Sequence, residues 1–221
     1  MMNAMHSTSS LSGSASQPSL RKRWGFRHRG FFGGVLLAPA LVLTLLSTPL
    51  IREGFWGDML MDALAWLCFV GGVTFRFWST LYVGGRKRHT LVCHGPYSVC
   101  RNPLYLGSLL LSMSAGLYLK SLTFVAFLTV VMLGYIFLTV PTEEDDLRLM
   151  LGEPYEEYCR RVPRFWPRWS LFAAPAETMF TLHGLRVEGK RALVWMLLPW
   201  LGEALAHLRV LPWWPHLFSL P

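Results

Sequence analysis

Long apolar runs separated by short polar segments dominate the first two thirds of the chain. The runs cover residues 31–51, 59–84, 103–119 and 121–140. Each approaches the roughly 20 residues that a helix needs to cross the hydrocarbon core of a bilayer. A helix on the surface of a water-soluble protein would instead carry a regular polar face. The pattern therefore predicts an all-α fold, a polytopic membrane helical bundle with about four transmembrane helices.

Individual residues refine these helices. Gly71 and Gly72 allow close contact with a neighbouring helix. Arg76 either snorkels toward the basic segment that follows it or is a functional intramembrane charge, and both interpretations stay open. Pro103 suits the first turn of a helix, where its missing N–H costs nothing. Lys120 begins the only polar break before the fourth run, so the last two runs form a helical hairpin.

The pattern changes to a helical amphipathic one after the fourth run. Thr142 is a plausible N-cap, and the acids at 143–146 suit the first turn of a helix. Apolar residues then recur at helical spacing to about residue 158, which predicts an amphipathic helix on the cytoplasmic side. Aromatic residues and arginines at 162–169 suit the membrane interface.

The two ends of the chain have a different composition. Residues 1–20 are rich in small and polar residues, which predicts a disordered tail. Residues 21–170 form the predicted membrane domain. Residues 171–221 are predicted as a C-terminal tail, and an interfacial helix anchored by Trp213 and Trp214 is the alternative, because Pro199 interrupts its apolar part.

Charge orients the predicted bundle. The chain has a net charge of +8, and its basic residues flank the apolar runs. Such flanking is the usual orientation signal of a membrane protein, so we expect no nucleic-acid partner. The N-terminal tail, the loop at 85–102 and the region after residue 141 are basic, whereas the two opposing loops offer only Arg52 and Lys120. Both termini and both polar clusters, 94–102 and 143–146, are therefore predicted to be cytoplasmic.

Four cysteines do not form a metal motif. Cys68, Cys93, Cys100 and Cys159 include no Cys-x-x-Cys pair and no metal-like spacing with histidine. We expect reduced structural thiols and no metal site. Cys93 and Cys100 lie near the polar loop, so lining a pocket is an alternative role for them.

The two polar clusters carry side chains that suit a zwitterionic, nucleoside-bearing ligand. The planar fork of Arg101 binds a carboxylate or phosphate. Glu143 and Glu144 offer acceptors to an ammonium group or to ribose hydroxyls, and Tyr97 and Tyr105 offer ring faces to a base or a cation. Each residue alone also has a structural explanation, as a membrane anchor, a helix start or an interfacial ring. Their joint occurrence on one predicted side favours a site.

Two motifs in this order resemble the isoprenylcysteine carboxyl methyltransferase family and its phospholipid methyltransferase relatives. The resemblance covers about residues 71–167. The first motif is His94-Gly95-Pro96-Tyr97-x-x-x-Arg101-Asn102-Pro103-x-Tyr105-x-Gly107. The second is Glu143-Glu144-x-x-Leu147-x-x-x-Leu151-Gly152-x-x-Tyr155-x-x-Tyr158-x-x-x-Val162-Pro163-Arg164.

The resemblance implies an integral membrane methyltransferase that uses S-adenosylmethionine and has a cytoplasmic cofactor pocket. The acceptor is expected to be lipophilic, either an isoprenylcysteine-like carboxylate, an amino lipid or a thiol. Arg101 and Glu144 are the expected catalytic residues, with Arg101 on the cofactor carboxylate and Glu143 or Glu144 on its ammonium or ribose. By similarity, the pocket is lined by His94, Gly95, Tyr97, Arg101, Asn102, Tyr105, Glu143 and Glu144.

Two departures from the family pattern concern the acceptor. Position 102 is Asn where carboxyl methyltransferases commonly have His, and residues 138–142 lack the arginine often found there. Two alternatives therefore stay open beside the methyltransferase. One is a non-catalytic membrane protein that retains the fold, and the other is a related membrane reductase that uses NADPH.

Overall fold

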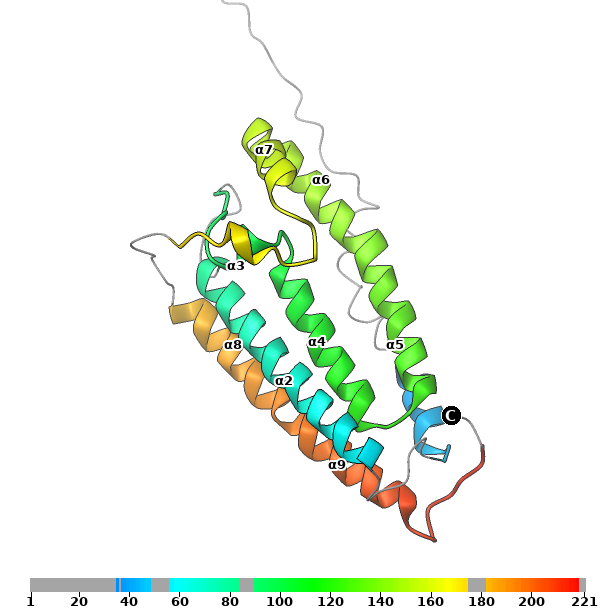
Figure 1. Ribbon diagram of the computed structural model, residues 1–221. Coiled ribbons are helices and arrows are strands. Elements are labelled where there is room, and N and C mark those ends of the chain that lie inside the picture. The colour runs from blue at the N-terminus through cyan, green and yellow to red at the C-terminus, as the bar shows by residue number, and fades with distance from the viewer. Residues whose placement is uncertain (1–34, 36, 49–55, 84–89, 175–181, 219–221) are drawn as a thin grey trace, which may run out of the picture.

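The computed structural model describes residues 35, 37–48, 56–83, 90–174 and 182–218 of the 221-residue chain. Within these ranges the chain is helical, and an isolated bridge between Ser47 and Phe218 is the one extended pairing. The long helices lie side by side in an elongated bundle (Figure 1). The predicted all-α class is confirmed.

Helices α2 (Trp56–Val83) and α4 (Pro103–Tyr118) form the centre of the bundle. They cross at Gly72 and Gly107, where a Cβ on Gly72 would lie 2.9 Å from the carbonyl oxygen of Gly107. A larger residue at either position would push the two backbones apart. Pro103 is the first residue of α4, as predicted.

Helix α5 (Leu122–Gly134) continues without interruption through a π-helical turn, η1 (Tyr135–Thr139), into α6 (Val140–Leu151). Pro141 explains the wide turn. In a regular α-helix its ring would clash with the carbonyl four residues earlier, and a π turn relieves this crowding.

The predicted N-cap at Thr142 is wrong, because no helix begins there. Thr142 lies inside the continuous helix, and its hydroxyl donates to the carbonyl oxygen of Leu138 at 2.8 Å. The acids at 143–146 follow Pro141 in the first turns of α6, which is the structural continuation of a membrane helix.

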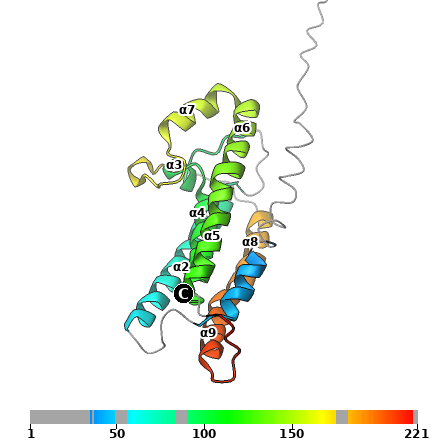
Figure 2. The ribbon, with the colours of Figure 1, turned by 90° about the vertical axis from the view of Figure 1, so that its right-hand side faces the viewer.

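Short elements cover one end of the bundle: α3 (Pro96–Val99), α7 (Glu153–Arg161) and η2 (Trp169–Leu171). Figures 1 and 2 place them beside the start of α4 and the end of α6. Gly152, with φ of 62°, makes the turn between α6 and α7.

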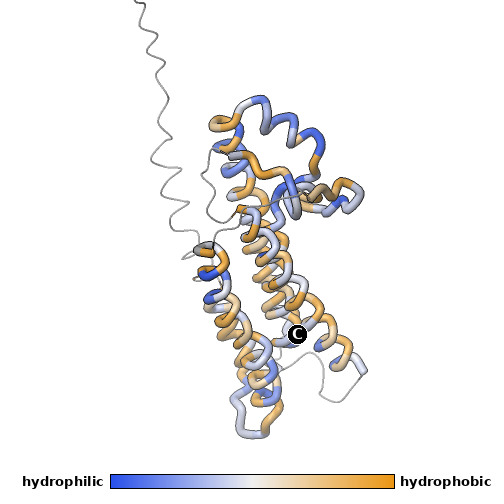
Figure 3. The backbone as a smooth tube through the Cα atoms, turned by 90° about the vertical axis from the view of Figure 1, so that its left-hand side faces the viewer, coloured by the Kyte–Doolittle hydropathy of each residue, from blue (hydrophilic) through white to orange (hydrophobic). Residues whose placement is uncertain are grey.

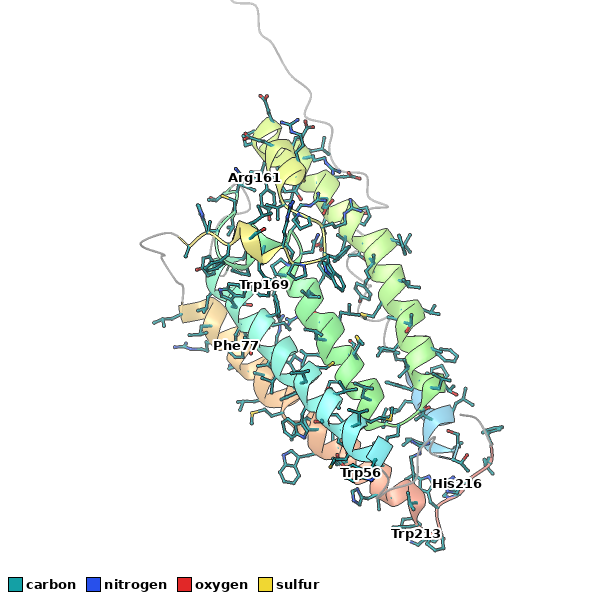
Figure 4. All side chains as sticks on the ribbon, in the orientation of Figure 1. Trp56, Phe77, Arg161, Trp169, Trp213 and His216 are labelled. Carbon is teal, nitrogen blue, oxygen red and sulfur yellow. The ribbon has the colours of Figure 1, made fainter. Side chains whose placement is uncertain are left out.

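The aromatic residues around η2 lie against α2. The ring of Trp169 stacks on that of Trp78, with centroids 6.2 Å apart and an interplanar angle of 5°. Figure 4 shows Trp169 at the end of the bundle that carries α3 and Arg161, whereas Trp56 and Trp213 lie at the opposite end.

The C-terminal region contributes two helices to the bundle, α8 (Leu182–Trp195) and α9 (Leu197–Val210). Helix α8 packs against α2, and α9 packs against α4 (Figures 1 and 2). Pro199 accounts for the break between them, because in a continuous α-helix its ring would clash with the carbonyl group of Trp195. The composition of this region predicts a tail or an interfacial helix, whereas the two helices together reach the length of a membrane span.

In the described part of the chain, three helical stretches are long and apolar enough to cross a membrane: Trp56–Val83, Leu122–Leu151 and Gly184–Val210. Helix α4 has the predicted position but only 16 residues. The first predicted span is described only in part, as helical backbone at residues 37–45, so the count of about four is not confirmed. Figure 3 shows apolar residues along the bundle and hydrophilic ones gathered at α6 and α7.

Buried ionic and polar contacts join the elements at the opposite end. Arg209 of α9 is fully buried and donates to the carbonyl oxygens of Leu119 at 2.7 Å and Ser47 at 2.9 Å. Lys120, in the turn between α4 and α5, is buried and pairs with Asp58 of α2. These contacts fix the α4–α5 turn against both α2 and α9.

Candidate functional site

Backbone hydrogen bonds hold the polar loop of the first motif against the segment that follows α7. The amide of Arg101 donates to the carbonyl oxygen of Pro163 at 2.8 Å, and the amide of Gly95 donates to that of Ala173 at 2.8 Å. The hydroxyl of Tyr158 donates to the carbonyl oxygen of Tyr97 at 2.7 Å. The two sequence motifs therefore meet at one end of the bundle, as the hairpin topology predicted.

Glu144 is the centre of the polar contacts in this region. Its side chain is only 2% exposed, and Nη2 of Arg164 donates to it at 2.7 Å. Asn102 Nδ2 donates to its other oxygen at 3.1 Å, and Nη1 of Arg101 lies 3.4 Å from Oε2. Asn102 also donates to the carbonyl oxygen of Arg164, at 3.2 Å. Glu144 thus links both motifs through its contacts with Arg101, Asn102 and Arg164.

Arg101 keeps donor capacity in this arrangement. Its Nε is buried and has no hydrogen-bond partner among the described residues. A buried N–H without an acceptor is uncommon in folded proteins, because it loses its hydration without replacement. Within the described part of the chain, Arg101 is therefore a guanidinium with an unsatisfied donor beside a buried carboxylate.

A pocket of about 580 Å³ lies between α2, α4, the η1–α6 segment and α8. Its volume falls within the range of small-molecule sites, roughly 300–1,000 Å³. Two predicted site residues, Tyr105 and Glu143, line it. The full lining is Arg76, Thr80, Val83, Leu104, Tyr105, Ser108, Tyr135, Glu143, Gly184, Val187, Glu188 and Arg191.

The other predicted site residues lie outside this lining. His94 is exposed at the start of the loop. Gly95 has φ of 62°, and a Cβ there would lie 2.3 Å from the ring of Tyr82, so the position requires glycine. Tyr97 lies in α3, and burial raises the pKa of its hydroxyl well above the usual value. The structure thus brings Arg101, Asn102 and Glu144 together and places Tyr105 and Glu143 on the pocket.

Arg76 does not snorkel, which corrects one of the two interpretations left open. Its Nε donates to Glu188 of α8 at 2.8 Å, and Nη1 donates to Ser108 of α4 at 2.6 Å. Its guanidinium carbon lies 4.6 Å from the centre of the Trp195 ring. Glu188, Ser108 and Trp195 therefore hold the Arg76 side chain at the pocket wall, and it does not extend toward the membrane surface.

Sequence reasoning missed the α8 residues of this wall. Glu188 is almost fully buried, and Arg191 Nη1 lies 3.3 Å from it. The sequence contains a signal, because Glu188 is the only acid between Glu177 and Glu203 and lies three residues before an arginine. A single acid in a helix that contacts membrane helices indicates a partner inside the bundle.

The cysteines are free thiols, as expected. Cys100 is fully buried, and burial raises the pKa of its thiol from 9.0 to about 11. Neither Cys93 nor Cys100 lines the pocket. Among the described residues, no group of three or more His, Cys, Asp or Glu side chains is arranged to hold a metal ion.

Comparison with known proteins places this geometry in a family. Residues 53–153 match the family model described as phospholipid methyltransferase, a segment that includes both polar clusters. The chain is 35% identical over 78 residues to protein-S-isoprenylcysteine O-methyltransferase B of Arabidopsis thaliana, covering 35% of this chain and 39% of that protein. No solved structure matches the chain.

Two bacterial relatives match over a longer region. The chain is 37% identical over 131 residues to the cobalt-zinc-cadmium resistance protein CzcN of Cupriavidus metallidurans, covering 59% of each. It is 30% identical over 178 residues to the nickel-cobalt-cadmium resistance protein NccN of Alcaligenes xylosoxydans xylosoxydans, covering 79% of this chain and 80% of that protein. With its motifs, its membrane helices and these matches, the chain belongs to the family of integral membrane methyltransferases that includes the phospholipid and isoprenylcysteine methyltransferases.

Proposed function

We propose that the protein transfers a methyl group from S-adenosylmethionine to a lipophilic acceptor in the membrane. One observation carries the proposal: eight of the twelve residues that line the pocket, Tyr105 and Glu143 among them, belong to the family segment that also holds the buried Arg101–Glu144 cluster. The acceptor is an isoprenylcysteine-like carboxylate, an amino lipid or a thiol.

The residues around the pocket fit this cofactor. S-adenosylmethionine carries a carboxylate, an ammonium, ribose hydroxyls and a sulfonium cation. Glu143 provides a carboxylate on the lining, and Arg101, which lies outside the lining, has a buried N–H that no described residue accepts and that suits an anionic group. Tyr105 and Tyr135 place aromatic side chains on the same lining, which suit a cation or a base. Charge type and pocket volume therefore agree with the cofactor.

The chain's own residues have separate roles in this proposal. Glu143 and Tyr105 contact the cofactor at the pocket wall. Arg101 binds its carboxylate, and Glu144, with Asn102 and Arg164, is a positioning residue that holds Arg101 in place. When bound, the sulfonium supplies a methyl group already activated for in-line displacement. The protein has to align the acceptor with it and exclude water, which is a large source of rate enhancement.

The membrane setting determines the direction of entry. The pocket lies near the polar end of the bundle, where Thr80 and Val83 of α2 and Gly184 of α8 line it. A lipophilic acceptor reaches it laterally from the bilayer, between the η1–α6 segment and α8. The basic flanking residues favour a cytoplasmic position for this end.

Binding of S-adenosylmethionine to the purified protein in detergent, measured by calorimetry, tests the proposal. We expect Arg101→Ala, Glu143→Gln and Glu144→Gln each to weaken binding at least tenfold. Glu156→Gln, an exposed acid of α7, is the matched control and should leave binding unchanged. Absence of binding by the wild-type protein, or undiminished binding by all three variants, would sink the proposed pocket. A labelled-methyl assay on membrane extracts then identifies the acceptor.

A second candidate function is a non-catalytic membrane protein that retains the fold. The names of the two bacterial relatives favour it, since they refer to metal resistance and to no methyl transfer. The same calorimetry separates the candidates, because a non-catalytic protein with a degenerate pocket would not bind S-adenosylmethionine.

A further inference from the structure

The pocket has a second charged wall that the methyl-donor residues do not use. Arg76 of α2 and Arg191 of α8 both line the pocket, and Glu188 of α8 lies between them. Glu188 accepts from Arg76 at 2.8 Å and from Arg191 at 3.3 Å. Two of these three residues lie beyond the segment that matches the family model.

The charges of this wall do not cancel. Glu188 has a side-chain exposure of 2% and neutralises one arginine. Arg191, 58% exposed at the pocket, is therefore an excess positive charge. Arg76 donates through Nε to Glu188 and through Nη1 to Ser108, and Arg191 donates through Nη1 to Glu188. Among the described residues these contacts leave further N–H groups of both guanidinium forks for a ligand. The wall is suited to bind an anion.

A purely structural ion pair explains these contacts less well. Joining α8 to α2 requires one arginine and one glutamate, and a buried pair of this kind contributes little net stability because both charges lose their hydration. The second arginine, on the open side of Glu188, is not needed for that purpose. Contact with the Trp195 ring and Ser108 also holds the Arg76 guanidinium in one orientation, as a binding group requires.

We propose that Arg76 and Arg191, bridged by Glu188, form a subsite for the anionic head group of an amphiphile, either a carboxylate or a phosphate. Planar guanidinium forks bind both groups bidentately. The apolar side chains of Val83, Leu104 and Val187 on the same lining accompany the alkyl part. Assigning this amphiphile as the methyl acceptor rests on the proposed function, whereas the anion subsite itself does not.

Binding of single-chain amphiphiles tests the subsite without requiring catalysis. The probes are decanoate, decyl phosphate and uncharged decanol, added to the full-length protein in a neutral detergent and measured by calorimetry. We expect the wild-type protein to bind at least one anionic probe tenfold or more tightly than decanol. Preference for decanoate or for decyl phosphate then distinguishes a carboxylate head group from a phosphate.

Three variants locate the binding. Arg191→Gln should weaken the anionic probe at least fivefold, and Arg186→Gln, the same change at an exposed α8 position outside the pocket lining, should not. Arg76→Gln leaves Glu188 buried without its main partner, so the double variant Arg76→Gln/Glu188→Gln is included to remove both charges together. Thermal unfolding checks that each variant is folded.

The outcomes are decisive in both directions. Equal affinity for decanol and both anions, or equal weakening by Arg186→Gln and Arg191→Gln, overturns the subsite. If Arg191→Gln loses binding of the anionic probe and still binds S-adenosylmethionine, the anion subsite is separate from the residues that bind the methyl donor. Retained anion binding by a protein that does not bind S-adenosylmethionine would keep the subsite and refute the proposed function.

Discussion

Glu144 and Glu188 are two buried glutamates with similar surroundings and different positions. Each has a side-chain exposure of 2% and forms ion pairs with at least two arginines. The close partners of Glu144 come from the motif loop and from the segment after α7, and none of them lines the pocket. Both partners of Glu188 line it. Burial and ion pairing thus identify glutamates that hold other side chains in place. Whether the arginines they hold can contact a ligand in the pocket depends on where each glutamate lies relative to the pocket.

The two glutamates also differ in how completely they are satisfied. Arg164 donates to Glu144 through Nε and Nη2, and Asn102 adds a further hydrogen bond. Such a network is costly to disturb, because removing the carboxylate leaves several donors uncompensated. Glu188 holds fewer groups, one of them more than half exposed. We therefore expect substitutions of Glu144 and its partners to affect stability most, and substitutions of Glu188 and its partners to affect binding of the anionic amphiphile most.

Glu144→Ala should give the largest loss of stability. Removing the carboxylate leaves Arg101 and Arg164 facing each other without a counter-ion, at a cost of about 3–5 kcal/mol. Detergent-titration unfolding measures the free energy. Asp145→Ala, at the exposed neighbouring acid, should cost less than about 0.5 kcal/mol. A similar loss in both variants would show that the Glu144 network is not a distinct contributor.

Glu188→Gln should cost less, about 2 kcal/mol, because the amide keeps one acceptor for Arg76 and loses only the charge. The double variant Arg76→Gln/Glu188→Gln should recover at least half of this loss, since two neutral side chains replace an unpaired cation. The same unfolding titration measures both. Failure of the double variant to recover stability would mean that the two residues act independently.

Gly107→Ala changes the packing of α4 against α2 beside Arg76, the partner of Glu188. The new methyl group would lie 2.6 Å from Cγ of Arg76 and 2.9 Å from the carbonyl oxygen of Gly72. We expect a loss of about 1–3 kcal/mol from overpacking, together with weaker binding of anionic probes. Gly134→Ala is the control. A Cβ there has no heavy atom within 4 Å, and alanine in a helix should stabilise by about 0.5–1 kcal/mol.

The smallest expected effect concerns the reactivity of Cys100, which directly precedes Arg101, a partner of Glu144. Burial raises the pKa of its thiol from 9.0 to about 11, so the folded state binds the proton more tightly than the unfolded state. This stabilisation is complete below about pH 9 and is lost as the pH rises through 11. At pH 8 we expect iodoacetamide to alkylate Cys93 several-fold faster than Cys100, measured by mass spectrometry. Equal rates would indicate that the loop opens readily.

Much of the bundle can be predicted from hydrophobic length and from proline. The predicted helix at 59–84 is observed at Trp56–Val83, and the one at 103–119 is observed at Pro103–Tyr118. Pro103 fixes a helix start because it cannot donate within the first turn. The meeting of Arg101, Asn102 and Glu144 also follows from the hairpin, whose two outer ends lie on one side.

The α8 wall could not be predicted in the same way. Arg76 and Glu188 are 112 residues apart, and no local periodicity relates them. Pro199 and the charged residues reduce the apolar signal of the C-terminal region, so its composition favours a tail or an interfacial helix. Only tertiary packing of α8 on α2 shows that these charges face a partner. The division of roles between Glu143 and Glu144 likewise depends on helix rotation.

The buried Arg209 has a consequence for biogenesis. It joins α9 to the α4–α5 turn and to Ser47, and the backbone of Phe218 pairs with Leu46 and Thr48. Ribosomes synthesise α8 and α9 after the other helices, so those helices enter the membrane before their polar groups have partners. The bundle and its α8 wall are completed only after α8 and α9 have been synthesised. A nascent chain that ends before α8 would expose Arg76 to lipid and be a substrate for quality-control proteases.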